Sequence, residues 1–226
     1  GDNYSLREGL VGYYKGIGID LEPADINITN GGSEALQIAL SVTCDPDDEV
    51  IVFEPFYTNY NSFALQNDVK LVPITTHIED GFALPPMSEV EKHITPKAKG
   101  VVICNPGNPT GCLYTKKALL ELGEIAKKHQ LFIYADEVYR EFCYTDEPHF
   151  SCMHIPGLEQ NVILLDSVLL NRGNRNTDLP PNVKIIQGDI NNDKDIATKF
   201  NDLKFDAICN FIAFVPEQVE RDYNLF

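Results

Sequence analysis

Tryptophan is absent from this chain of 226 residues, and so are cysteine pairs of the CxxC type. No uninterrupted apolar run reaches about 18 residues, the length that a membrane-spanning helix needs. Basic residues are scarce, because 18 Lys and Arg stand against 34 Asp and Glu, for a formal net charge of −16. A surface of this sign disfavours nucleic acids and anionic membranes as partners.

The cysteines and the first residues of the chain bear on its cellular location. The six cysteines are scattered along the sequence, which in a chain of this length favours reduced thiols over a disulfide framework. The N-terminus, Gly1-Asp2-Asn3-Tyr4, lacks the basic and then apolar pattern of a secretory signal. We therefore expect a soluble, cytoplasmic protein that binds neither nucleic acid nor a membrane.

One segment has crude metal-ligand character. His149, Cys152 and His154 lie close together in the sequence, but no fourth ligand type lies nearby. A structural metal site in a protein usually needs four ligands. We therefore interpret the segment as a surface loop and predict no metal site.

Short apolar runs alternate with helical patterns over most of the chain. Continuous apolar runs of this kind are typical of strands that are buried on both faces of a sheet. We predict helices over about 33–42 and over 116–128, and after residue 168 a strand at 183–186, a helix at 193–200 and a strand at 207–209. The strands predicted before residue 168 are Val50–Phe53, Val101–Cys104, Leu131–Tyr134 and Val162–Leu165. This order predicts an α/β fold, a mostly parallel sheet flanked by helices.

A glycine pair leads into the first of these helices, in Thr29-Asn30-Gly31-Gly32-Ser33-Glu34-Ala35-Leu36. Backbone N–H groups at a helix N-terminus carry partial positive charge and suit a phosphate, and glycine lets the anion approach closely. An ordinary helix cap explains the same pattern, so the motif alone leaves both interpretations open.

A second motif, Asn105-Pro106-Gly107-Asn108-Pro109-Thr110-Gly111, follows the predicted strand 101–104. Ligands of open α/β sheets bind at the carboxyl ends of the strands. Two Asn-Pro turns in seven residues predict a rigid loop there, which is either a ligand-binding segment or simply a tight connection.

A third motif, Tyr134-Ala135-Asp136-Glu137-Val138-Tyr139, ends another predicted strand. A carboxylate at this place is costly unless it meets a cation. A protonated pyridine nitrogen is one such cation, and the carboxylate would hold it protonated. The alternative is an exposed Asp–Glu pair at a strand end.

Taken together and in this order, the three motifs resemble fold-type I pyridoxal-phosphate aminotransferases, close to the aspartate and aromatic aminotransferase group. The resemblance covers residues 1–168, the middle of the large cofactor-binding domain of that family. The residues that match the family's cofactor contacts are Gly32, Ser33, Glu34, Tyr57, Asn108, Asp136 and Tyr139.

The resemblance implies a role for each of these residues. The first three lie where the family binds the cofactor phosphate, and Tyr57 lies on the aromatic residue that stacks on the pyridine ring. Asn108 and Tyr139 match the residues that contact the ring hydroxyl, and Asp136 matches the aspartate that pairs with the ring nitrogen. The family implies pyridoxal 5′-phosphate as cofactor, an amino acid and a 2-oxo acid as substrates, and a homodimer.

The lysine on which the family's chemistry depends is missing. The family has an Asp-Ser-x-Ser-Lys pattern here, and its lysine forms a Schiff base with the cofactor and moves the proton. In this chain Asp166-Ser167-Val168 begins the pattern correctly, but Leu170 stands at the lysine position. No lysine occurs between Lys128 and Lys184. We therefore predict no catalytic residue. The stretch that resembles the family also contains neither its N-terminal arm nor its small domain.

From Leu169 onward the sequence resembles NAD(P)-dependent epimerase/dehydratase proteins, the extended short-chain dehydrogenase type. The match rests on Asn171-Arg172, on Ile185-Ile186-Gln187-Gly188-Asp189-Ile190 and on the strand near Ala207. It implies a partial Rossmann-like segment over 169–226. This segment lacks the GxxGxxG loop and the Tyr-x-x-x-Lys pair of that family.

The simplest interpretation is a join of two fragments, 1–168 and 169–226, with a seam near 167–170. Net charge changes at the same place, from −14 before it (11 basic, 25 acidic residues) to −2 after it (7 basic, 9 acidic residues). Three functions stay open: an aminotransferase-type pyridoxal-phosphate protein that is inactive as written, an NAD(P)-dependent sugar epimerase or reductase, and a non-catalytic chimera. The join itself could be engineered, an assembly artefact, unrelated segments numbered consecutively, or a natural two-domain protein.

Overall fold

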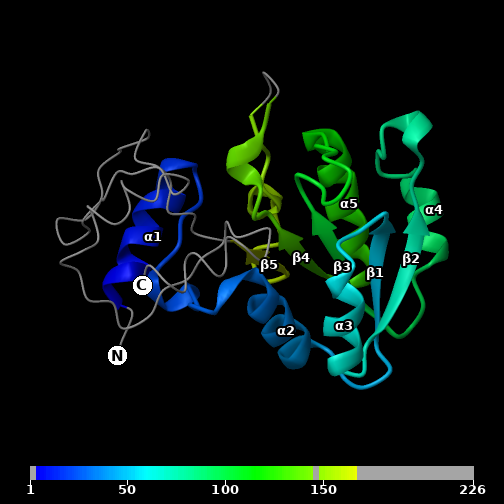
Figure 1. The fold of residues 1–226 in the computed structure, drawn as a ribbon, viewed down its shortest axis with the longest axis horizontal. Helices are drawn as coiled ribbons and strands as arrows, with labels where there is room; N and C mark the ends of the chain where they lie inside the picture. The colour runs from blue at the N-terminus through cyan, green and yellow to red at the C-terminus, as the bar shows by residue number, and fades with distance from the viewer. Residues whose placement is uncertain (1–3, 145–147, 167–226) are drawn as a thin grey trace, which may run out of the picture. The chain divides into compact units, whose positions relative to one another are not determined.

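The computed structural model of the chain describes residues 4–144 and 148–166 (Figure 1). These residues belong to the first of two units into which the chain divides, Gly1–Val168 and Leu169–Phe226. The strands and the helix predicted beyond residue 168, and Leu170 itself, lie outside the described residues. The predicted seam near 167–170 also stays a prediction.

The described residues form one sheet of five parallel strands in the order β2-β1-β3-β4-β5. The strands are β1 (Glu49–Glu54), β2 (Lys70–Thr75), β3 (Ala98–Cys104), β4 (Phe132–Asp136) and β5 (Val162–Leu165). The four strands predicted from apolar runs are confirmed, and the structure adds β2, which has no such run. Strand β4 extends to Asp136, so this carboxylate lies on the last residue of the strand.

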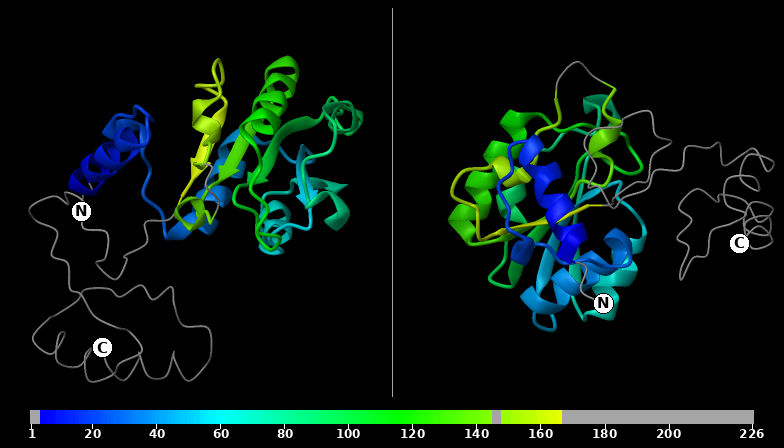
Figure 2. Two further views of the ribbon diagram at one scale, coloured as in Figure 1. Left: turned by 90° about the horizontal axis from the view of Figure 1, so that it is seen from above. Right: turned by 90° about the vertical axis from the view of Figure 1, so that its left-hand side faces the viewer.

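Helices cover both faces of the sheet (Figure 2). The helices are α1 (Tyr4–Gly16), α2 (Gly31–Thr43), α3 (Asn59–Gln66), α4 (Met87–Lys92) and α5 (Lys116–His129). The predicted helices over 33–42 and 116–128 are confirmed as α2 and α5. Helix α5 begins at the capping residue Thr115, whose hydroxyl accepts from the N–H of Ala118 at 3.2 Å.

The strand period of two divides the core between the two faces of the sheet. On β1, Val50 and Val52 pack against α2 and α3, whereas Ile51 and Phe53 pack against α4 and α5. All four side chains are buried. The continuous apolar run of the sequence is therefore the signature of a central strand that is covered on both sides.

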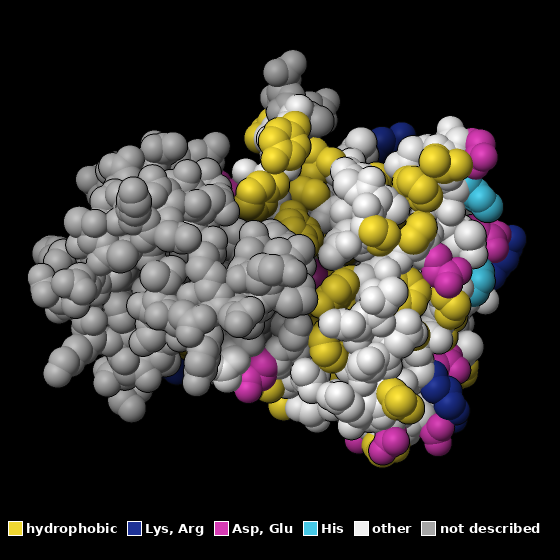
Figure 3. Space-filling model, in the orientation of Figure 1, with side chains coloured by type: hydrophobic (Ala, Val, Ile, Leu, Met, Phe, Trp, Pro, Cys, Tyr) yellow, Lys and Arg dark blue, Asp and Glu magenta, His cyan; other side chains and the backbone are white. Residues whose placement is uncertain are grey.

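A smaller apolar cluster joins α1 to the rest of this unit. Tyr14, Ile19 and Ile26 form its buried part, and Met153 and Leu164 pack against it. Among the described residues, no helix is long and apolar enough to cross a membrane. Figure 3 shows hydrophobic side chains gathered along the upper middle of one face, with charged side chains over its right-hand margin.

Candidate functional site

The carboxyl ends of the parallel strands meet at one edge of the sheet. Cys104 at the end of β3 and Asp136 at the end of β4 are partners in register, and Asp136 is also the partner of Leu165 on β5. Ligands of open α/β sheets bind at this edge. The motifs that the sequence analysis singled out after residues 104 and 134 therefore face the same place.

Asp136 is a carboxylate held by neutral donors. One of its oxygens accepts a hydrogen bond from the Tyr60 hydroxyl, and the other accepts from the N–H of Val138 at 3.5 Å. Burial raises the pKa of Asp136, and the nearby charge of Asp166 adds to the rise. Among the described residues no Lys, Arg or His forms an ion pair with it. The side chain is thus a half-buried carboxylate whose ionised form a cation would stabilise.

Tyr60 on α3 is a site residue that the sequence analysis missed. Its ring lies edge-on to Tyr57, with centroids 5.6 Å apart, and parallel to Phe56 at 6.1 Å. Burial and the charge of Asp136 raise the pKa of its hydroxyl, which therefore stays protonated and donates. The spacing of three residues between Tyr57 and Tyr60, one turn of a helix, was the available signal.

The loop after β3 is built from its own polar contacts. The buried side chain of Asn105 accepts from the N–H of Tyr114 at 2.9 Å, and the N–H of Gly107 donates to the carbonyl of Cys112 at 2.8 Å. A Cβ on Gly107 would lie 2.7 Å from the Thr110 hydroxyl, so a larger residue here requires that side chain to move. The structure has a loop after β3 as predicted, with hydrogen bonds within it.

Asn108 at the tip of this loop meets Tyr139. Its side-chain N–H group donates to the Tyr139 hydroxyl at 3.4 Å. Burial raises the pKa of Tyr139, and the carboxylate of Asp136 contributes to the rise, so the ring lies near Asp136. A small pocket lies on the Asn108 side of this edge and is lined by Phe56, Tyr60, Cys104, Gly107 and Asn108, among others, but not by Asp136 or Tyr139. The structure therefore brings Tyr57, Asn108, Asp136 and Tyr139 to one edge of the sheet.

The predicted phosphate-binding residues lie in the first turn of α2. The N-cap Asn30 makes no side-chain capping bond, so the N–H groups of that turn have no partner within the helix. The Glu34 carboxylate reaches back and accepts from the backbone N–H of Asn30 at 2.5 Å. Gly32 and Ser33 thus lie at a helix start, where Glu34 puts its own negative charge.

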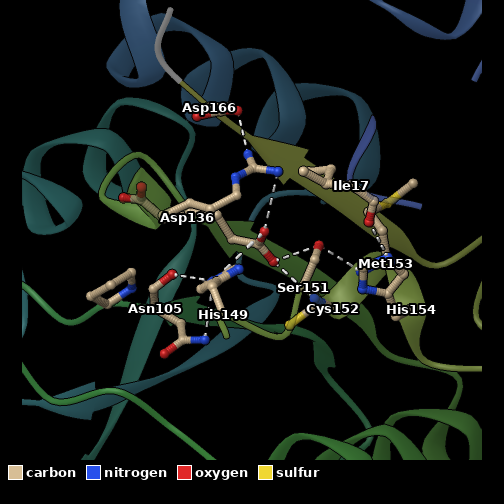
Figure 4. A network of polar contacts seen from close by, with 12 residues as sticks. Ile17, Asn105, Asp136, His149, Ser151, Cys152, Met153, His154 and Asp166 are labelled. Atoms are coloured by element: carbon tan, nitrogen blue, oxygen red, sulfur yellow. Dashed lines mark hydrogen bonds and ion pairs between the residues drawn. The ribbon is translucent and has the colours of Figure 1, made fainter. Parts of the chain in front are cut away.

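The alternative interpretation, in which Asp136 and Glu137 form an exposed pair, is wrong for Glu137. Its side chain is fully buried, and one oxygen accepts from the Ser151 hydroxyl at 3.0 Å and from the N–H of Cys152 at 2.8 Å (Figure 4). The other oxygen lies 3.8 Å from Arg140 and has no hydrogen bond. Burial raises the pKa of Glu137 to about 7.

The two histidines of the crude metal motif bond to backbone instead. A ring nitrogen of His149 lies 3.0 Å from the carbonyl of Asn105, and one of His154 lies 3.1 Å from that of Ile17. Burial lowers the pKa of His149. Within the part of the chain that the structure describes, no three His, Cys, Asp or Glu side chains form a group that could hold a metal ion.

The carboxyl edge of this parallel α/β sheet thus gathers a half-buried carboxylate, an amide and three tyrosine side chains. A model of the family "Aminotransferase class I and II" matches residues 2–168. The chain therefore belongs to this family over that range. The second resemblance, over 169–226, lies outside this match and outside the described residues.

Individual relatives support the same assignment. The putative aminotransferase YugH of Bacillus subtilis is 35% identical over 165 residues, which cover 72% of this chain and 42% of YugH. The glutamate-pyruvate aminotransferase AlaA of Escherichia coli is 36% identical over 150 residues, 66% of this chain and 36% of AlaA. The chain thus spans less than half the length of the curated relatives it matches.

Solved structures agree with the fold. A mutant of the aspartate aminotransferase of Thermus thermophilus superposes with a TM-score of 0.68 at 31% identity, covering 72% of this chain and 42% of that one. The aromatic aminotransferase of Pyrococcus horikoshii gives a TM-score of 0.69 at 30% identity, with 72% and 44% covered. The predicted parallel sheet flanked by helices is therefore confirmed for the described residues.

Proposed function

We propose that this chain binds pyridoxal 5′-phosphate at the carboxyl edge of its sheet, as an aminotransferase-type domain, and has no turnover as written. The observation that carries the proposal is the half-buried Asp136 carboxylate, which the Tyr60 hydroxyl holds and which forms no ion pair with a cation among the described residues. A protonated pyridine nitrogen is a cation of the right shape for this place.

Different residues of the chain would contact different parts of the cofactor. Asp136 would hold the ring-nitrogen proton, and the Tyr60 hydroxyl would keep the carboxylate oriented. Tyr57 would cover the ring, and Asn108 with Tyr139 would donate to its hydroxyl. When bound, the cofactor supplies an electron sink for bonds at the α-carbon of an amino acid.

The phosphate end requires one rearrangement. Gly32 and Ser33 would offer backbone N–H groups to the phosphate, but the Glu34 carboxylate already occupies the N–H of Asn30. Two negative groups at one helix start repel each other, so Glu34 would turn away when phosphate binds. This competition is a reason to expect weak binding.

Substrates and assembly of the whole protein remain part of the proposal. An L-amino acid and a 2-oxo acid fit the names of the relatives, and a homodimer is the assembly that the family resemblance implies. The absence of turnover rests on Leu170, which stands at the position of the lysine that binds the cofactor covalently in the family. NAD(P) chemistry has no support from any described residue, so we propose none.

Titration with pyridoxal 5′-phosphate tests the proposal. Asp136→Ala should weaken binding by about 1.5–3 kcal/mol, the range for a hydrogen bond to a charged group, or about 10- to 150-fold in Kd. Fluorescence or absorbance of the cofactor reports the affinity of the full chain. Asp80→Ala, at an exposed carboxylate, is the matched control and should bind like the unsubstituted chain. Equal affinity in the Asp136 and Asp80 variants would show that the site is elsewhere.

A further inference from the structure

Three carboxyl groups and one guanidinium meet at the ends of β4 and β5. They belong to Asp136, Glu137, Asp166 and Arg140 (Figure 4). Arg140 is 7% exposed, and one of its terminal nitrogens donates to a carboxylate oxygen of Asp166. Its other terminal nitrogen lies 3.8 Å from Glu137. A single buried cation therefore serves this acidic cluster among the described residues.

Asp166 lies on the strand next to Asp136, one residue beyond Leu165, which is the partner of Asp136 in register. Two carboxylates at adjacent strand ends repel, and each disfavours ionisation of the other. The negative charge of Asp166 accordingly raises the pKa of Asp136.

Arg140 is held by Asp166 and by two aromatic rings of helix α1. Its guanidinium lies over the ring of Tyr14 at 5.3 Å and over that of Tyr13 at 5.8 Å, both within the range of a cation–π contact. The Tyr14 hydroxyl donates to the same oxygen of Asp166 at 2.8 Å. Two aromatic rings and one shared acceptor thus leave the guanidinium a single orientation.

We propose that Arg140 is a positioning residue for the cation site at Asp136: it offsets part of the negative charge that Asp166 presents to Asp136 from the neighbouring strand. The inference rests on the proposed function in so far as the cation is the ring nitrogen of pyridoxal phosphate. Arg140 forms no ion pair with Asp136 and so leaves it for that ligand, while it weakens the effect of the second carboxylate nearby.

The sign of the effect follows from the groups that face Asp136. These are Tyr60 from α3, Cys104 from β3, Tyr139 after β4 and Asp166 after β5. The three neutral groups stay protonated at neutral pH, since burial raises the pKa of each. When Arg140 is removed, the negative charge of Asp166 is therefore the one near Asp136 that is no longer offset. Cation binding needs ionised Asp136 and is lost as the pH falls through its pKa.

Charge variants of the full chain test this role. Carbon-13 NMR of the aspartate carboxyl groups gives the pKa of Asp136 without cofactor, and titration with pyridoxal 5′-phosphate gives the acidic limb of binding. Arg140→Gln should move the pKa of Asp136 and the midpoint of the acidic limb to higher pH by about one pH unit. A nearby charge acts on a pKa on this scale. Asp166→Asn should move both to lower pH. Arg140→Lys should stay close to the unsubstituted chain, because it keeps the charge.

The double variant Arg140→Gln/Asp166→Asn separates charge from architecture. It should return both midpoints to the values of the unsubstituted chain, whereas a purely structural role would leave it at least as perturbed as Arg140→Gln. Lys117→Gln, at an exposed lysine, makes the same change in net charge and should shift nothing. If Arg140→Gln does not fold, Asp166→Asn and the double variant still decide. If the unsubstituted chain binds no pyridoxal phosphate, the proposed function fails, while the NMR midpoints still test Arg140.

Discussion

Glu137 shows how much one buried side chain can weigh on stability. Its folded-state pKa is raised to about 7 by burial, while in the unfolded chain the carboxyl has its ordinary pKa. The folded state therefore holds this proton more tightly. The stabilisation is complete below the ordinary pKa of a glutamate and is lost as the pH rises through about 7.

We expect Glu137→Gln to flatten the pH dependence of the unfolding free energy. The unsubstituted chain should lose up to about 3 kcal/mol through this group between about pH 5 and about pH 8, and the variant should not. Urea unfolding at a series of pH values measures the difference. Glu79→Gln, at an exposed carboxylate, is the control and should follow the unsubstituted chain. Parallel curves for the unsubstituted chain and the Glu137 variant would contradict the assignment.

Residues that end a motif were predictable, and residues that depend on distant contacts were not. Asp136 ends a strand, and Asn108 and Tyr139 lie in the loops after two strands, where the sequence already indicated a ligand edge. The burial of Glu137 depends on Ser151 and Cys152, which follow 14 and 15 residues later and which no sequence pattern linked to Glu137. A local sequence pattern carries no information on a contact between segments so far apart in the chain.

Elements with a strong period were predictable in the same way. Strands β1 and β3 and helix α5 have continuous apolar runs or a clear helical stripe, and the structure confirms them. Strand β2 was missed because its sequence, Lys-Leu-Val-Pro-Ile-Thr, is broken by Pro73. Proline is tolerated there because β2 lies at an edge of the described sheet, where its missing N–H interrupts no ladder on the outer side.

Strand β3 shows how tightly neighbouring elements are packed. A Cβ on Gly100 would lie 2.8 Å from the Phe132 carbonyl oxygen and 2.6 Å from the ring of Tyr134. The Tyr134 hydroxyl is itself held by the Thr43 hydroxyl at 2.6 Å, so the ring has little room to move. We expect Gly100→Ala to destabilise the fold by about 1–3 kcal/mol, the usual cost of overpacking.

A second glycine supplies the control for this prediction. Gly12 on α1 has no heavy atom within 4 Å of an added Cβ, and alanine favours a helix by about 1 kcal/mol over glycine. Gly12→Ala should therefore leave the midpoint of thermal or urea unfolding unchanged or raise it. Equal midpoints for the two variants would mean that β3 and β4 can separate without cost.

At the scale of the whole molecule, the prediction from the sequence is that the family's covalent anchor, the lysine, is missing. We expect no transamination of aspartate with 2-oxoglutarate by the chain as written, with pyridoxal 5′-phosphate added, because Leu170 can neither bond the cofactor nor move a proton. Loss of the acid–base role alone costs on the order of 10²- to 10⁴-fold in rate. A coupled assay compared with free cofactor is the measurement. Turnover above that background would show that another group replaces the lysine.

The seam near 167–170 is a prediction from the sequence alone. The change in net charge and the change in resemblance both fall near 167–170, but no described residue lies beyond Asp166. Intact mass with terminal sequencing would establish whether the chain is continuous there. The match to the aminotransferase family ends at residue 168, so the family assignment is independent of that outcome.

The hydrogen bond from Tyr14 to Asp166 joins residues that are 152 positions apart in the chain. During synthesis α1 leaves the ribosome first, whereas its anchor is translated only after all five strands of the described sheet. Strands β1 to β4 have all been translated before β5, so their pairing does not need the segment that carries Asp166. The nascent chain therefore carries Tyr13 and Tyr14 without Arg140 or Asp166 for most of its translation. Helix α1 can dock in its final place only once the last described residue has been made.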